Sequence, residues 1–137
     1  MPFQEIPHTA DYALRVWAAD ISSLFVEAAS GMWSLCGAHT INNPSIERDL
    51  ELAASTLEGL LVAFLSELVY SAEKERVIFT DIESIHISEV DGNYALKTHL
   101  KGLPLVSQNK YIKAVTYHNL NIQKSEENFE VIIVFDV

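Results

Sequence analysis

The sequence is poor in cysteine and in basic residues, and both shortages exclude classes of protein. Cys36 is the only cysteine among 137 residues, so no internal disulfide can form, which fits a reducing compartment. Nine lysines and arginines oppose 19 aspartates and glutamates, which gives a formal net charge of -10. A negative field repels phosphate backbones, so we expect no direct binding to nucleic acid. A basic partner or a bound cation fits this charge better.

Long apolar segments are lacking as well. The longest stretch of this kind, residues 57–70, is interrupted by two glutamates, a glycine and a serine, and it is too short to cross a bilayer. Residues 1–5 contain neither the basic nor the apolar region of a signal peptide. We therefore expect a soluble cytoplasmic protein without membrane contacts. The sequence leaves its oligomeric state open.

The composition that remains is that of one folded domain. Hydrophobic residues make up 49% of the chain and the mean hydropathy is +0.14, which excludes intrinsic disorder. A chain of 137 residues is too short for two independent cores, so we expect a single domain over 1–137.

The first half of the chain alternates between strand and helix patterns. Period-two alternation predicts strands over 12–19 and 45–54. Helical spacing predicts helices over 21–36, stopping at Gly37, and over 56–75. In front of the second helix, Ser55-Thr56-Leu57-Glu58 has the spacing of a capping box.

The second half is expected to be β-structure. Segments 77–90 and 94–101 flank Asp91-Gly92-Asn93, a strong hairpin signal. A loop with Gly102 and Pro104, a strand over 110–123, a turn at 125–128 and a last strand over 129–137 follow. The order predicts an α+β fold with two helices packed on largely antiparallel sheet.

Common catalytic signatures are absent from this sequence. It has no Gly-x-Ser-x-Gly motif and no Walker-type glycine loop. Its five histidines do not have the spacing of a zinc site. Cys36 lies among apolar residues at the end of a predicted helix, so we expect a buried, unreactive thiol.

Two aspartates lie in otherwise uncharged neighbourhoods and could bind a hard cation. Asp11 immediately precedes a predicted strand, and Asp136 lies at the end of an apolar one, beside the terminal carboxylate of Val137. Two negative groups at a strand end repel each other unless a cation or basic residue lies between them. The alternative is a solvated, frayed terminus. Lys113, within an apolar and aromatic segment, is either a functional cation or an ordinary surface lysine.

Three segments together resemble the archease family. They are 6–11 (Ile-Pro-His-Thr-Ala-Asp) leading into 13–17 (Ala-Leu-Arg-Val-Trp), 112–118 (Ile-Lys-Ala-Val-Thr-Tyr-His) and 134–137 (Val-Phe-Asp-Val). Archeases are small acidic proteins that assist RtcB-type RNA ligases, which join a 2′,3′-cyclic phosphate or 3′-phosphate end to a 5′-hydroxyl end. The resemblance implies an accessory protein rather than an enzyme. Such a protein promotes guanylylation of the ligase and its multiple turnover in tRNA splicing or RNA repair.

The same resemblance implies roles for four residues and assigns none as catalytic. Asp11 and Asp136 match two functional aspartates of the family, and Val137 adds an oxygen to their metal site. Lys113 matches a lysine required for ligase activation. Ligation by oxygen alone favours Ca²⁺, with Mg²⁺ or Mn²⁺ as alternatives. Pro7 departs from the family pattern, in which an acidic residue often precedes the histidine.

Two other functions remain open from the sequence. One is a small metal-dependent hydrolase in which Asp11 and Asp136 bind the metal and His8 or His118 acts as base. The other is a chaperone-like binding protein, although Cys36 alone cannot support a disulfide switch.

Overall fold

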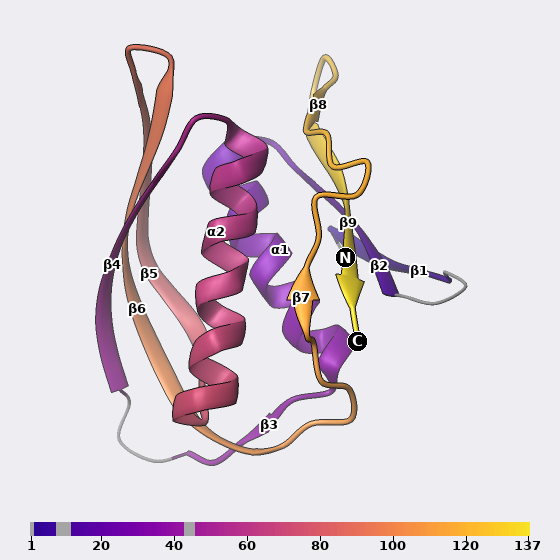
Figure 1. Ribbon diagram of the computed structural model, residues 1–137, viewed down its shortest axis with the longest axis vertical. Coiled ribbons are helices and arrows are strands. Elements are labelled where there is room, and N and C mark those ends of the chain that lie inside the picture. The colour runs from indigo at the N-terminus through magenta and orange to yellow at the C-terminus, as the bar shows by residue number, and fades with distance from the viewer. Residues whose placement is uncertain (1, 8–11, 43–45) are drawn as a thin grey trace.

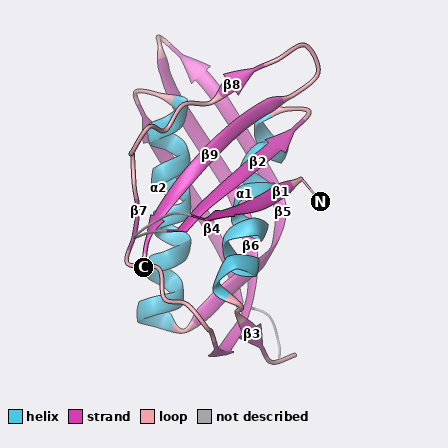
Figure 2. Ribbon diagram, turned by 90° about the vertical axis from the view of Figure 1, so that its right-hand side faces the viewer, coloured by secondary structure: helices cyan, strands magenta, loops and turns pink. Residues whose placement is uncertain are grey.

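Two helices lie side by side between two antiparallel sheets in the computed structural model (Figures 1 and 2), which describes residues 2–7, 12–42 and 46–137. This arrangement confirms the predicted α+β class with two helices on antiparallel sheet. None of the helices in the described part of the chain has the length and apolar character that a bilayer span requires.

Helix α1 (Ile21–Cys36) has the predicted bounds because both of its ends are capped. The side chain of Asp20 accepts a hydrogen bond of 2.7 Å from the backbone N–H of Ser23. At the other end Gly37 adopts a left-handed conformation, with φ of +62°, and donates to the carbonyl of Ser34.

Helix α2 (Leu57–Tyr70) continues into a π-helical segment, η1 (Ser71–Glu75), so the predicted range 56–75 is helical but not α-helical throughout. The capping-box prediction is wrong by one residue. Thr56, not Ser55, caps the helix by accepting from the N–H of Gly59 at 2.9 Å. Glu58 does not turn back to the helix end, because its carboxylate accepts a 2.9 Å bond from the N–H of Ile122.

The four-stranded sheet consists of β3 (His39–Thr40), β4 (Ile46–Ala54), β5 (Val77–Val90) and β6 (Asn93–Ser107). Both β4 and β5 pair with β6, so β6 lies between them. The predicted hairpin is confirmed. Asp91 and Gly92 both have positive φ, 54° and 79°, as a two-residue type I′ turn requires.

The expected loop around Gly102 and Pro104 is instead part of β6. Gly102 pairs with Ile46 and Pro104 pairs with Val77. A Cβ atom at Gly102 would lie 2.7 Å from Val77 Cγ1, so glycine here permits a close approach between strands rather than a turn.

The five-stranded sheet has the order β1 (Phe3–Pro7), β2 (Tyr12–Ala18), β9 (Phe129–Asp136) and β7 (Ala114–Val115), and β8 (Gln123–Lys124) also pairs with β9. Strand β1 had no counterpart among the expected elements. The expected strand over 110–123 is wrong, because only its short pieces β7 and the start of β8 pair. Between them Asn119 has a φ of 50° and Leu120 donates to the carbonyl of Tyr117, which turns the chain.

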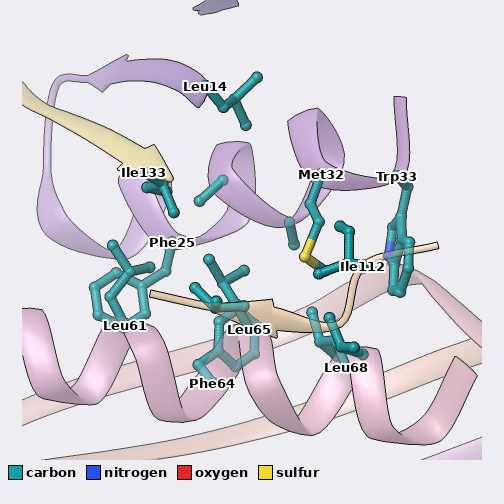
Figure 3. Close-up of a cluster of buried hydrophobic side chains, with 14 of the residues drawn as sticks. Leu14, Phe25, Met32, Trp33, Leu61, Phe64, Leu65, Leu68, Ile112 and Ile133 are labelled. Atoms are coloured by element: carbon teal, nitrogen blue, oxygen red, sulfur yellow. The ribbon is translucent and has the colours of Figure 1, made fainter. Parts of the chain in front are cut away.

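The core fills the layer between the two sheets (Figure 3). Phe25 of α1 and Phe64 of α2 stack with their ring centroids 5.9 Å apart. Leu14 and Ile133 reach this layer from the five-stranded sheet, and Ile112 reaches it from the segment before β7. The core therefore joins α1 and α2 to the inner faces of both sheets.

An ion pair ties η1 to the four-stranded sheet and makes stability depend on pH. Arg48 of β4 donates to both carboxylate oxygens of Glu75, at 2.8 and 2.6 Å, and its guanidinium lies over the Phe79 ring. The hydrogen bond from Arg48 is the main reason that the pKa of Glu75 lies below its ordinary value. A lowered folded-state pKa contributes stability above the unfolded-state pKa, and this contribution is lost as pH falls through the folded-state value.

We expect Glu75→Gln to lower the free energy of unfolding at neutral pH and to change it little in acid, where the wild-type carboxyl is protonated too. Denaturant unfolding at neutral and acid pH measures this difference. The matched control is Glu51→Gln, because the Lys97–Glu51 pair is longer, at 3.5 Å, and exposed. Equal stability of Glu75→Gln and wild type at neutral pH would contradict the expectation.

Candidate functional site

Three of the residues singled out from the sequence, Lys113, Asp136 and Val137, lie at the carboxyl end of β9, where the chain ends in Figures 1 and 2. Asp136, the last residue of β9, pairs with Ala114 of β7. On the other side of β9, Phe135 pairs with Tyr12, the first residue of β2. Strands distant in sequence therefore meet at this point.

Lys113 and Asp136 are neighbours through their main chains. The N–H of Lys113 donates a 2.7 Å hydrogen bond to the carbonyl of Asp136, and the N–H of Thr116 donates at 3.0 Å to the carbonyl of Val134. Both charged side chains are exposed, and no basic side chain among the described residues forms an ion pair with Asp136. The site thus presents an ammonium and a carboxylate that do not neutralise each other in a closed pair.

Apolar neighbours hold both charged residues in place. Ile112 and Val115, on either side of Lys113, are buried, and Val137 is half-buried and packs against the core. The side chain of the last residue is therefore anchored, in contrast to the frayed terminus that the sequence left as an alternative. Exposed Asp136 projects from a strand end that is fixed by packing on both sides.

The segment before Lys113 is held by three contacts. The N–H groups of Asn109 and Lys110 both donate to the carbonyl of Cys36 at the end of α1, at 2.8 and 3.0 Å. The ammonium of Lys110 lies 4.7 Å from the centroid of the Tyr12 ring in β2. These contacts fix the path by which the chain reaches Lys113.

Asp11 and His8 lie outside the described residues, so the predicted closeness of Asp11 to Asp136 stays a prediction. His118 is described and lies in the turn after β7, where its N–H contacts Thr116 Oγ1 and its ring contacts Asn119. Ala114 pairs with Asp136, and the N–H of Thr116 already donates to the carbonyl of Val134, two residues back along antiparallel β9. The chain therefore moves away from Asp136 before it reaches His118.

A surface hollow of about 390 Å³ lies beside Lys113. Its charged lining comes from Glu73, Arg76 and Lys113, and its apolar lining includes Ile112 and Trp33. The indole nitrogen of Trp33 is buried without a hydrogen-bond partner among the described residues. Sequence analysis missed this hollow because its walls come from α1, η1 and the segment before β7.

The exposed aromatic side chains near Lys113 were missed as well. Tyr111 is 62% exposed and Tyr117 is 64% exposed. Ile112 and Val115 are buried between them, but Val115 lies an even number of residues from exposed Lys113 and Tyr117, so the segment has no period-two pattern. Its hydrophobic pattern therefore gave no signal that would identify the exposed set.

Cys36 takes no part in a reactive site. Its side chain is buried at the end of α1, as expected. Burial raises the pKa of the Cys36 thiol to about 11, although the positive charge of Lys110 acts in the opposite direction. At neutral pH the thiol is protonated and poorly nucleophilic.

We expect Cys36 in the native protein to react with an aromatic disulfide reagent at least about 100-fold more slowly than an ordinary cysteine, because only the thiolate reacts. Absorbance of the released thiol at about pH 8 measures the rate. The same protein unfolded in denaturant is the control and should react at the ordinary rate. Fast labelling of the native protein would contradict the burial of Cys36.

Comparison with known proteins shows the family of this chain. The model of the Archease protein family (MTH1598/TM1083) matches residues 3–137. The chain belongs to the archease family. It is 30% identical to the protein archease of Methanopyrus kandleri over 141 residues, which cover 100% of both chains. It is also 30% identical to the protein archease of Methanosarcina barkeri, over 98% of this chain and 95% of that one.

Solved structures show the same archease fold. Protein 1598 of Methanobacterium thermoautotrophicum superposes with a TM-score of 0.75 and 21% identity, over 99% of both chains. A Thermotoga maritima protein described as an archease and possible chaperone superposes with a TM-score of 0.65 and 21% identity, over 98% of this chain and 96% of that one. At this identity the likeness concerns the fold alone.

Proposed function

We propose that this archease-family protein activates an RtcB-type RNA ligase, promoting guanylylation of the ligase and its multiple turnover in tRNA splicing or RNA repair. The observation that carries the proposal is the end of β9, where exposed Asp136 is joined through the main chain to exposed Lys113. These are two of the residues that the resemblance connects with ligase activation. Family membership supports the extension to this chain.

The proposed activating group is an acidic tip formed by Asp11, Asp136 and the carboxylate of Val137. Asp11 directly precedes Tyr12 in the chain, and Tyr12 pairs with Phe135, which directly precedes Asp136. This register supports the proposal that both aspartates belong to one site. Their donors are oxygens only, which suits Ca²⁺, with Mg²⁺ or Mn²⁺ as alternatives. A bound cation would supply positive charge that offsets the repulsion among the carboxylates.

The charge of the chain itself suits a basic partner. A protein with net charge -10 is attracted to the basic surface that a ligase needs for binding RNA and GTP. Tyr111 and the adjoining hollow offer an aromatic surface beside the ammonium of Lys113, and tyrosine is enriched in protein interfaces. We assign docking to this surface, and entry into the ligase cleft to the acidic tip.

The structure gives less support to the two other functions. A hydrolase would need a general base near the metal ligands, whereas the register separates His118 from Asp136. A general chaperone needs a contiguous apolar surface. Several of the exposed large apolar side chains are dispersed over different elements: Ile41, Tyr70, Val90, Val106 and Ile132. A selective effect of the variants below separates ligase activation from general chaperoning.

We expect Asp136→Asn to remain folded but to lose stimulation of ligase guanylylation, on the order of 10-fold or more, because a carboxylate of the acidic tip is removed. A guanylylation time course with the RtcB-type ligase of the same genome measures the stimulation, and circular dichroism reports folding. The control is Glu130→Gln, which removes another β9 carboxylate, one that is paired with Arg15. Full stimulation by folded Asp136→Asn would exclude the acidic-tip mechanism.

We expect Lys113→Gln to weaken the same stimulation by roughly 3- to 10-fold, because it removes a charge from the docking surface. Ca²⁺ binding by the protein should change little, since an ammonium is not a metal ligand. The control is Lys124→Gln, a lysine over the Phe129 ring at the opposite end of β9. A loss of equal size in both lysine variants would show a general charge effect and contradict a role for Lys113.

A further inference from the structure

A second group of metal-ligand side chains lies on the outward face of the four-stranded sheet, away from the end of β9. It consists of His99, Glu47 and Glu83, hereafter the His99 cluster. His99 Nε2 lies 2.9 Å from a Glu47 oxygen and 3.5 Å from a Glu83 oxygen. One ligand atom from each of the three residues lies within 4.8 Å of the others. Three donors from three different strands therefore converge on one point.

The strand register builds this convergence. His99 lies on the central strand β6, Glu47 lies on β4, and Glu83 lies on β5. The pairing of β5 with β6 shifts around Glu83, because Ile82 pairs with Leu100 while Ser84 pairs with His99. Glu83 is thus the extra residue of a bulge. Bulges redirect side chains and are frequent at functional sites.

The donor set and spacing suit a transition-type divalent cation. One imidazole nitrogen with two carboxylates is a mixed set that Zn²⁺ accepts, whereas Ca²⁺ prefers oxygen alone. Two ligands that each lie about 2.1 Å from a tetrahedral ion are about 3.4 Å from each other. The observed separations of 2.9 and 3.5 Å need only small side-chain adjustments.

Asp49 supplies the outer contact that metal-binding histidines commonly have. Its carboxylate lies 2.6 Å from His99 Nδ1, whereas Glu47 and Glu83 lie near the other ring nitrogen, Nε2. A carboxylate that accepts from Nδ1–H fixes the ring orientation and leaves Nε2 to face the ion. This aspartate is a positioning residue rather than a ligand.

The surroundings leave the cluster both negative and accessible. His99 is surrounded by three carboxylates, those of Glu47, Asp49 and Glu83. Among the described residues one lysine pairs with this group: Lys101, 2.8 Å from Glu83. The hydrogen bonds that His99 donates to the Asp49 and Glu47 carboxylates raise the pKa of His99. An open hollow of about 640 Å³ adjoins His99 on the side of Asp49. Glu47 and Glu83 are themselves exposed, so an ion can reach them directly from solvent.

We propose that His99 Nε2, Glu47 and Glu83 form a binding site for a divalent transition cation of the Zn²⁺ type, oriented by Asp49 and completed by water. This site shares no residue with the oxygen-only site at the acidic tip. Its ion joins β4, β6 and β5 across the sheet. Binding therefore stabilises the folded state and raises the melting temperature with increasing metal.

The test is calorimetric titration of the full chain with Zn²⁺ at about pH 8, with excess Ca²⁺ present to occupy oxygen-only sites. We expect wild type to bind one Zn²⁺ at this site. The affinity for Zn²⁺ should fall at least about 100-fold in His99→Gln and about 10-fold in Asp49→Asn. Visible absorption of Co²⁺ in place of Zn²⁺ should show a tetrahedral spectrum in wild type and lose it in His99→Gln.

The matched control is His86→Gln. His86 pairs with Lys97 on the same face of the sheet and lies outside the His99 cluster, so Zn²⁺ affinity should be unchanged. Circular dichroism confirms folding, and Glu83→Gln provides a second ligand variant. Equal Zn²⁺ affinity of wild type and folded His99→Gln would overturn the proposal, as would an equal loss in His86→Gln.

Discussion

Burial of α2 between two sheets is the constraint on which the rest of the structure depends. Half of its 14 residues are buried, and they point to more than one side: Leu60, Leu61, Val62, Phe64, Leu65, Leu68 and Val69. Such a helix needs apolar partners on more than one side, which the sheets on either side of the helical layer supply, while Ser66, Glu67 and Tyr70 remain exposed. The chain satisfies this need by placing α1 beside α2 and an antiparallel sheet over each face.

This layering decides where polar chemistry can occur. The inner faces of both sheets are occupied by the core, so charged side chains collect on outer faces and at strand ends. Asp136 and Lys113 mark one such end, and the His99 cluster marks one such face. The two places are separated by the helical layer, and their donor chemistry differs. Oxygen donors alone are proposed at the strand end, whereas the sheet face includes an imidazole.

Local signals made α1 predictable and left parts of the second half unpredictable. The periodicity of α1 agrees with its caps at Asp20 and Gly37, so its bounds followed from the sequence. Glycine and proline at positions 102 and 104 are equally compatible with a loop and with a strand that another strand approaches closely. Only the pairing with β4 and β5 distinguishes the two cases. The expected strand over 110–123 is interrupted at Asn119, which adopts a left-handed conformation that the neighbouring residues do not predict.

The candidate site shows the same division. Asp136, an acid at the end of an apolar strand, and Lys113, within an apolar and aromatic segment, were both singled out from the sequence, and the family resemblance gave them a role. Their main-chain contact depends on long-range pairing. The His99 cluster depends on register still more, because Glu83 reaches it only through a bulge. A sequence pattern reports the face on which a side chain lies, and it does not report the opposite strand.

The main-chain link between Lys113 and Asp136 also affects the cost of binding a partner. The hydrogen bond between the N–H of Lys113 and the carbonyl of Asp136 fixes the distance between the two residues. Their side chains therefore do not need to form an ion pair with each other to stay in place. A partner can therefore engage the ammonium and the carboxylate without first breaking a salt bridge between these two side chains. The site is preorganised at the backbone, which removes ordering cost from the encounter and leaves both charges for recognition.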